Sequence, residues 1–214
     1  MTTAADIAGT TPAGSIGRLA ALGAATVYEA NGQQDALDPA LKPLDPTSRV
    51  AGRAVTVDLE PGDNWYIHVA LLEAGKGDIL VVDAKGYTQA GPWGDVLTLA
   101  AQERGLAALV IDGAVRDSQE IIASGFPVFT RGICIRKTTK VQQGKVNVPV
   151  MIGGVLINPG DILVGDADGL VRVRPDDVEA AVASSEKREQ KEETMRTKIR
   201  EGASTLDLLG LSKP

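Results

Sequence analysis

The sequence predicts an α/β domain in which buried parallel strands alternate with helices. Two similar segments, GDILVVDAKG at 77–86 and GDILVGDADG at 160–169, are short apolar runs bounded by turn residues, as is typical of buried strands. A third apolar run, at 106–111, follows a segment with helical periodicity. Parallel strands joined by helical crossovers explain this order. The 214 residues, 43% of them hydrophobic, suffice for one large core but hardly for a second.

The N-terminal part of the chain predicts an arm, a helix, a strand and a second helix, in that order. Residues 1–14 are rich in Thr, Ala and Gly without an apolar period, so we expect a flexible arm. A helix is predicted over 15–31, and the alternating apolar residues of 49–59 predict a strand. Asp63 is then expected to be the N-cap of a helix over 64–74.

The middle of the chain predicts two further helices and several short strands. Val96, Leu99 and Ala100 are spaced as the apolar face of a helix, and 117–124 predicts a short helix. The segments that follow are punctuated by Gly and Pro, and short β segments are predicted at 127–136, 146–157 and 169–174.

The C-terminal part predicts a long helix and tail at 175–214, after a single domain at 15–174. Pro175 with the two Asp residues after it is a strong helix start. The helix carries few apolar residues before its charged run at 186–201: Val178, Ala181 and Val182. This apolar face is too small to hold the helix on its own chain alone, so we expect it to pack against a neighbouring subunit. The charged run is most simply a solvated face.

Composition excludes several classes of function. The formal net charge of −6, without a long basic cluster, argues against nucleic acid as a partner. No apolar run approaches the roughly 20 residues of a membrane span, and the N-terminus lacks the pattern of a signal peptide. The single Cys134 cannot form an internal disulfide. We therefore expect a cytoplasmic protein that acts on a small molecule.

Two loop-to-helix segments carry the strongest chemical signal. Asp95 ends the first, GPWGD at 91–95, and twenty intervening residues separate it from the Arg116-Asp117 pair of the second. This spacing matches one helix, one turn and one strand, so both segments are expected at the same edge of a sheet. A site for a hard metal ion and an anion is the chemistry that this arrangement suggests.

The residue inventory narrows the type of metal. With one His and one Cys, the chain cannot build a zinc site from Cys and His ligands, and a Ser-His-Asp triad could use only His68. Carboxylates remain, and they suit Mg²⁺ or Mn²⁺. We expect Asp117 to be the metal ligand and Asp95 to hold a metal-bound water. Arg116 could grip a carboxylate or stabilise an enolate oxygen.

Backbone groups at a helix start could bind the substrate carboxylate. The N–H groups concerned belong to Gly94, Asp95, Val96 and Leu97.

The side chains of the site also have explanations that involve only the stability of the fold. Asp117 with Glu120 also reads as an acidic capping box, and Asp95 as an N-cap. His68 could be a packing histidine, or it could join Asn64, one turn earlier on the same helix face, in a pocket.

The sequence also resembles a known family. Four segments carry the resemblance: GDNWYIHVA (62–70), GPWGDVLTLAAQERGLAALVIDGAVRD (91–117), VNVPV (146–150) and NPGDILVGDADGLVRV (158–173). They look like the 4-hydroxy-4-methyl-2-oxoglutarate/4-carboxy-4-hydroxy-2-oxoadipate aldolases, whose fold the ribonuclease E inhibitor RraA shares. The most specific element is the family's Asp, twenty residues, Arg-Asp, two residues and an acidic residue, matched by Asp95, Arg116, Asp117 and Glu120.

The resemblance implies an RraA-like swivelling β/β/α core that assembles as a homotrimer or homohexamer. It implies a class II pyruvate aldolase in which Asp117 binds the divalent metal, Arg116 contacts pyruvate and Asp95 orients a metal-bound water. The backbone of Gly94 to Leu97 would cradle the carboxylate of the 2-oxo acid substrate.

Further site residues are implied by the resemblance alone. Asn64, His68 and Lys140 fall where the family places polar groups on the substrate side. Glu192 falls near an acidic residue that a neighbouring subunit supplies. The implied reaction cleaves either substrate to pyruvate plus pyruvate or oxaloacetate, with decarboxylation of oxaloacetate as a side activity.

Other classes of function predict different features. A non-catalytic, RraA-like regulator that binds an RNA-processing enzyme would use the same fold without metal-dependent turnover. A class I aldolase needs a Schiff-base lysine in a pocket that lowers its pKa, and the sequence indicates no such pocket. A menaquinone methyltransferase needs a glycine-rich loop with an acidic ribose partner, which the sequence lacks.

Overall fold

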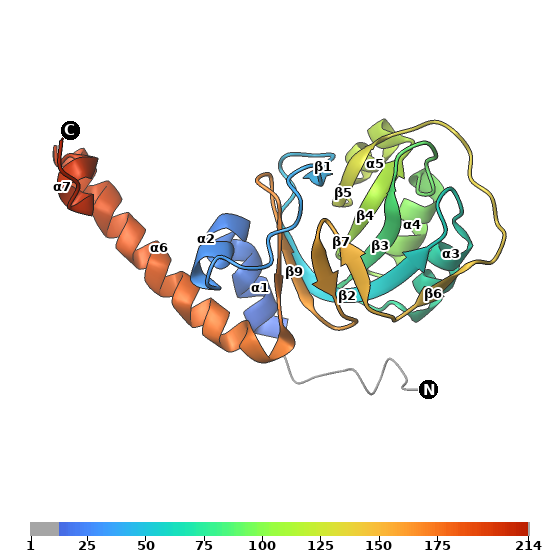
Figure 1. Cartoon of the computed structure of the whole chain (residues 1–214), viewed down its shortest axis with the longest axis horizontal. Coiled ribbons are helices and arrows are strands. Elements are labelled where there is room, and N and C mark those ends of the chain that lie inside the picture. The colour runs from blue at the N-terminus through green and yellow to red at the C-terminus, as the bar shows by residue number, and fades with distance from the viewer. Residues whose placement is uncertain (1–12, 214) are drawn as a thin grey trace.

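The computed structural model describes residues 13–213 and shows a mixed α/β body from which a long C-terminal helix extends (Figure 1). The predicted arm lies almost wholly outside the described residues. The helices are α1 (Ala13–Leu22), α2 (Ala24–Ala30), α3 (Trp65–Glu73), α4 (Asp95–Glu103), α5 (Ser118–Ser124), α6 (Val178–Arg200) and α7 (Thr205–Leu209). The strands are β1 (Lys42–Pro43), β2 (Val50–Leu59), β3 (Asp78–Tyr87), β4 (Ala108–Val115), β5 (Val128–Ile133), β6 (Gly144–Val146), β7 (Val150–Ile152), β8 (Val155–Ile157), β9 (Ile162–Gly165) and β10 (Leu170–Val173).

The main sheet has the strand order β1-β5-β4-β3-β2-β9-β10, and β6 also pairs with β2. Its centre, β2 to β5, is parallel, and α3, α4 and α5 are the crossovers between successive strands. The strands β1, β6, β9 and β10 add antiparallel pairs around this centre. This curled α/β sheet with its long C-terminal helix confirms the predicted fold class.

Three apolar cores hold these layers together. The first lies between one face of the parallel strands and α3 to α5, and it includes the fully buried Trp93. The second lies on the other face, under the β7–β8 hairpin. The third joins α1, α2 and the start of α6 to β9 and β10. Apolar burial on both faces is what the uninterrupted apolar runs of β3 and β4 predict.

The helical stretch predicted over 15–31 is present, but it is divided into α1 and α2. Gly23 separates them with φ of 86°, a left-handed conformation that glycine adopts without strain. The Asp166 carboxylate accepts a hydrogen bond of 2.8 Å from the Ala24 N–H, which satisfies a free donor at the new helix start. The break therefore depends on a residue far away in the sequence.

The predicted apolar face of α4 is also wrong. Val96 and Leu99 are 71% and 59% exposed, whereas Leu97, Thr98 and Ala101 are buried. The apolar residues of this nine-residue helix are spread over more than one face, so the periodicity of the sequence alone does not show which face is buried. The buried hydrogen bond from the Trp93 indole to Thr98 Oγ1, at 2.7 Å, fixes the helix with Thr98 inward.

The C-terminal segment begins as predicted, with a 3₁₀ turn at Pro175–Asp177 that leads into α6. The first turns of α6 pack on α1 and α2 through Val178, Ala181 and Val182. The contact continues through the buried Ser185 and through the ion pairs of Glu186 with Arg18 and of Arg188 with Glu29, and the helix then projects from the body (Figure 1). Its packing on a neighbouring subunit stays a prediction. Across residues 13–213, no helix combines the length and the apolarity that crossing a membrane requires.

Candidate functional site

A cavity of about 410 Å³ lies where β4 and β5 end and α4 begins. It brings together most of the residues that the sequence analysis selected. Its walls come from α3, from the turn before α4, from the end of β4 and from the loop after β5. The lining residues are Asn64, His68, Gly91, Pro92, Gly94, Asp95, Val96, Leu97, Arg116, Lys137, Thr138 and Lys140.

The turn before α4 presents its backbone to this cavity because two glycines leave room for it. A Cβ atom at Gly94 would clash with Asp117 Oδ2, and one at Gly91 would clash with the Cys134 carbonyl oxygen. Between them, the Trp93 carbonyl accepts a hydrogen bond of 2.9 Å from the Arg116 N–H. The turn and the end of β4 therefore form one rigid unit.

Asp117 projects its carboxylate toward the start of α4 and not toward its own helix. The residue precedes α5 in a left-handed conformation, with φ of 55°, and its side chain makes no capping hydrogen bond. Its Oδ2 accepts a hydrogen bond of 3.3 Å from the Asp95 N–H and lies 3.4 Å from Arg116 Nε. The capping-box alternative for Asp117 is therefore wrong. A non-glycine residue held in this conformation is frequent at functional sites.

Asp95 is the first residue of α4, and Gly94 occupies the N-cap position. The alternative of Asp95 as the N-cap is therefore wrong. The exposed Asp95 side chain stands in the first turn of the helix, where a negative charge is favourable. The first N–H groups of a helix have no intrahelical acceptor and attract anions. One of these four expected donors, the Asp95 N–H, is directed at Asp117.

The carboxylates present fit a hard divalent cation better than zinc. Within residues 13–213, no group of three or more His, Cys, Asp or Glu side chains could hold a metal ion. Mg²⁺ needs no such group, since one or two carboxylates, several waters and substrate oxygens complete its shell. Asp117, with Asp95 adjacent, supplies such a donor set. The metal itself stays a prediction.

The wall opposite Arg116 is built from α3 and the loop after β5. Asn64 is buried, donates from Nδ2 to the Pro92 carbonyl at 3.1 Å and accepts from Lys140 Nζ at 3.0 Å. Asn64 also occupies the N-cap position of α3 that was predicted for Asp63. The Asp63 carboxylate nevertheless accepts from the Trp65 N–H, at 2.8 Å. The prediction therefore missed the N-cap by one residue, although Asp63 does satisfy the helix start.

His68 lies on the solvent-facing side of α3 and lines the cavity, so the packing alternative is wrong for this residue. Its partial burial at the cavity wall, followed by the positive charge of Lys140, lowers the pKa of the imidazole. At neutral pH the ring is therefore neutral and can accept a proton.

Sequence reasoning missed Lys137 and Thr138, which line the cavity beside Lys140. The basic run RKTTK at 136–140, in a chain of net charge −6, was an available signal.

Glu192 pairs with Arg188 and Arg196 on α6, on the side of the body away from α3 and α4 in Figure 1. Its predicted role therefore requires a second subunit.

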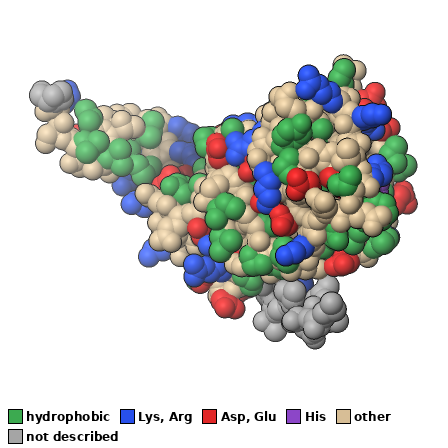
Figure 2. Space-filling model, turned by 45° about the vertical axis from the view of Figure 1, so that its right-hand side comes forward, with side chains coloured by type: hydrophobic (Ala, Val, Ile, Leu, Met, Phe, Trp, Pro, Cys, Tyr) green, Lys and Arg blue, Asp and Glu red, His purple; other side chains and the backbone are tan. Residues whose placement is uncertain are grey.

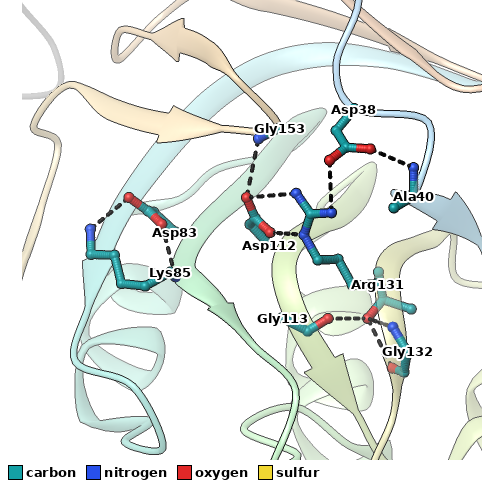
Figure 3. A network of polar contacts seen from close by, with 10 residues as sticks. Asp38, Ala40, Asp83, Lys85, Asp112, Gly113, Arg131, Gly132 and Gly153 are labelled. Carbon is teal, nitrogen blue, oxygen red and sulfur yellow. Dashed lines mark hydrogen bonds and ion pairs between the residues drawn. The ribbon is translucent and has the colours of Figure 1, made fainter.

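Asp112, at the start of the second loop-to-helix segment, belongs to a structural network instead of the cavity (Figure 3). Its carboxylate pairs with Arg131 on β5 and accepts from the Gly153 N–H at 3.1 Å. Arg131 also pairs with Asp38 at 3.0 Å. The network ties the β7–β8 hairpin to the parallel strands.

The fold and the cavity define an α/β protein with a polar cavity at the ends of its parallel strands. The family model described as RraA-like, Aldolase/RraA, matches residues 23–172. The chain belongs to this RraA-like family.

Individual relatives agree with this assignment. A protein of Halalkalibacterium halodurans, provisionally named a 4-hydroxy-4-methyl-2-oxoglutarate aldolase, is 41% identical over 75% of this chain and 76% of its own length. The crystal structure of an uncharacterised protein from Pseudomonas syringae pv. tomato is similar with a TM-score of 0.81 and 27% identity, covering 90% of this chain and 91% of that one. Streptomyces coelicolor RraAS2, described as an unusual member of the RNase ES inhibitor RraA family, gives a TM-score of 0.77 and 29% identity over 86% and 96% of the two chains.

Proposed function

We propose that this protein is a divalent-metal-dependent lyase, a class II pyruvate aldolase. Its substrates would be 4-hydroxy-4-methyl-2-oxoglutarate or 4-carboxy-4-hydroxy-2-oxoadipate. The observation that carries the proposal is that Arg116 and the start of α4 line one cavity and that the Asp117 carboxylate contacts both of them, at the Asp95 N–H and at Arg116 Nε. The name of the Halalkalibacterium relative supports the same reaction class.

The substrate carboxylate would bind at the start of α4, where N–H groups without an intrahelical acceptor and the positive end of the helix dipole favour an anion. Arg116 lines the same cavity and would donate to the 2-oxo group. The hydrogen bond from its N–H to the Trp93 carbonyl and the approach of its Nε to Asp117 orient the guanidinium before substrate arrives. Such preorganised donors are the main source of catalysis at a developing oxyanion.

A divalent cation would be held by Asp117, with Asp95 beside it. When bound, such an ion supplies Lewis acid chemistry that polarises the 2-oxo acid. Neutral His68 would remove the proton from the substrate's C4 hydroxyl, and the C3–C4 bond would then break. The hydroxyl-bearing carbon leaves as pyruvate or oxaloacetate, and the electron pair stays on the other fragment as a pyruvate enolate. Arg116 would stabilise the enolate oxygen until the enolate carbon takes up a proton from water. His68 would return its proton to water, so that no net proton is consumed.

The pH dependence should report on His68. Because its pKa is lowered, the neutral form persists below pH 6.5, the ordinary pKa of histidine. We expect kcat/KM to decline only below about pH 6.5, and the acid limb to be absent from the low residual activity of His68→Gln. A pH–rate profile of both proteins measures this. An acid limb that is unchanged in the variant would assign the base to another group.

The direct test is pyruvate release from 4-hydroxy-4-methyl-2-oxoglutarate and from oxaloacetate. We expect turnover of both with Mg²⁺ or Mn²⁺, loss of turnover with a chelator, and recovery when the metal is restored. Decarboxylation of oxaloacetate is expected because it passes through the same enolate. Well-folded, metal-loaded protein that releases no pyruvate from either substrate would contradict the proposal.

A second candidate is a non-catalytic regulator that binds an RNA-processing enzyme. The observation that favours it is the likeness to RraAS2 over most of both chains. This alternative predicts inhibition of a ribonuclease without metal-dependent turnover, so the pyruvate assay separates the two candidates.

We further propose a cytoplasmic homotrimer or homohexamer in which α6 packs on a neighbouring subunit and brings Glu192 near that subunit's cavity. Exposed apolar side chains near the C-terminal end of the chain, where α6 and α7 project from the body, support such packing (Figure 2): Ile199, Leu209 and Leu211. Sedimentation velocity of the full chain measures the assembly state.

A further inference from the structure

The loop that closes one side of the cavity contains little regular structure. It runs between β5 and β6, passes α4 and α3 in Figure 1, and contributes Lys137, Thr138 and Lys140 to the lining. Long lysine side chains on such a loop lose much conformational entropy when they are held in one place. The position of the loop must therefore be fixed by contacts outside it.

Asp63 supplies these contacts, together with the backbone beside it. Its side chain is fully buried, and its Oδ2 accepts from Thr139 Oγ1 at 3.0 Å and from the Val141 N–H at 2.6 Å. Its Oδ1 accepts from the Trp65 N–H at the start of α3. The backbone adds a short β-bridge, in which the Thr139 N–H donates to the Gly62 carbonyl at 2.9 Å. One carboxylate thus joins α3 to the loop.

Lys140 lies between the two tethered residues of the loop. Its ammonium group donates to Asn64 Oδ1, and Asn64 follows Asp63 directly in the chain. Asp63 itself cannot reach a bound substrate, since none of its surface is exposed. A buried carboxylate is costly unless every oxygen is hydrogen-bonded, and here both oxygens are.

From this geometry we propose that Asp63 is a positioning residue, which acts through the loop and sets the place of Lys140 in the cavity. The expected effect on KM rests on the proposed function, whereas the expected effect on the position of the loop does not. Asparagine at this position keeps the size of the side chain and the acceptor for Trp65. The amide nitrogen that replaces Oδ2 is a donor, so it cannot accept the hydrogen bonds from the Thr139 hydroxyl and the Val141 N–H.

The kinetic test compares Asp63→Asn with Lys140→Met and with the double variant. We expect Asp63→Asn to raise KM for the 2-oxo acid by about tenfold or more, the size of one lost charge-assisted hydrogen bond, with a smaller change in kcat. If Asp63 acts through Lys140, the double variant is no worse than Lys140→Met alone. Additive effects would overturn the proposal.

Trypsin gives a readout that does not depend on turnover, because it cleaves after Lys137 and Lys140. Cleavage of native Asp63→Asn in this loop should be at least about tenfold faster than that of the wild type, since proteolysis follows the population of the opened loop. Thr139→Val removes one of the hydrogen bonds and should give an intermediate rate.

Asp78→Asn is the matched control. Asp78 accepts from the Gly75 N–H in the turn after α3, at the far end of that helix from the loop. Equal cleavage rates in Asp63→Asn and Asp78→Asn would show a general loss of stability and would overturn the proposal. Faster loop cleavage in Asp63→Asn alone, in a protein without lyase activity, would support the tether and reject the proposed function.

Discussion

Asp117→Asn is expected to lower pyruvate release by at least about 10²–10³-fold, because a catalytic metal contributes several kcal/mol and each 1.36 kcal/mol changes the rate tenfold. Asparagine keeps the shape of the side chain and one oxygen that can accept from the Asp95 N–H, so the fold around Asp117 should persist. The negative charge that would hold the cation is lost. Steady-state kinetics at saturating Mg²⁺ measures the effect, and calorimetric titration with Mn²⁺ measures the lost affinity.

Glu103→Gln is the control for this substitution. Glu103 is exposed at the C-terminal end of α4, the opposite end from the cavity, so its neutralisation removes one negative charge without touching the site. We expect unchanged turnover and unchanged metal affinity. An Asp117→Asn variant that keeps both properties would exclude Asp117 as the metal ligand, whatever the reaction proves to be.

The sequence was sufficient to predict the features that depend on local patterns. Apolar runs predicted β3 and β4, and the spacing between Asp95 and Arg116 predicted that both would reach one edge of the sheet. Both residues do line one cavity. A helix, a turn and a strand of ordinary length leave the chain few other ways to place them.

Features that depend on distant contacts could not be predicted. The break at Gly23 requires Asp166, and the loop at 137–141 requires Asp63, more than 70 residues earlier. The basic run at 136–140 marks Lys137 as a candidate for binding an anion, but no local pattern says which wall of the protein an irregular loop will cover. At Asp117 a strong local pattern is misleading: the sequence matches a capping box, but the Asp117 side chain makes no capping hydrogen bond. Its left-handed backbone turns the carboxylate toward α4 instead.

Trp93→Ala is expected to lower the free energy of unfolding by about 3–5 kcal/mol, the usual cost of truncating a fully buried tryptophan. Trp93 is the largest fully buried side chain of the described residues, stacks on Phe126 with ring centroids 6.2 Å apart and donates to Thr98 Oγ1. For a chain of this size the loss corresponds to a Tm lower by roughly 10 °C. Thermal unfolding followed by circular dichroism measures the shift.

The second tryptophan of the chain provides the control. Trp65 is 36% exposed at the start of α3, so Trp65→Ala should cost far less than Trp93→Ala. Trp93→Phe keeps the stacking on Phe126 but leaves Thr98 without its donor, and it should lie between the two, at about 1–3 kcal/mol. Because the Trp93 carbonyl also orients Arg116, we expect substrate affinity to fall in Trp93→Ala even well below its Tm. Equal losses of stability at the two tryptophans would mean that the turn before α4 is not packed as the structure shows, and the rigid placement of Arg116 would lose its physical basis.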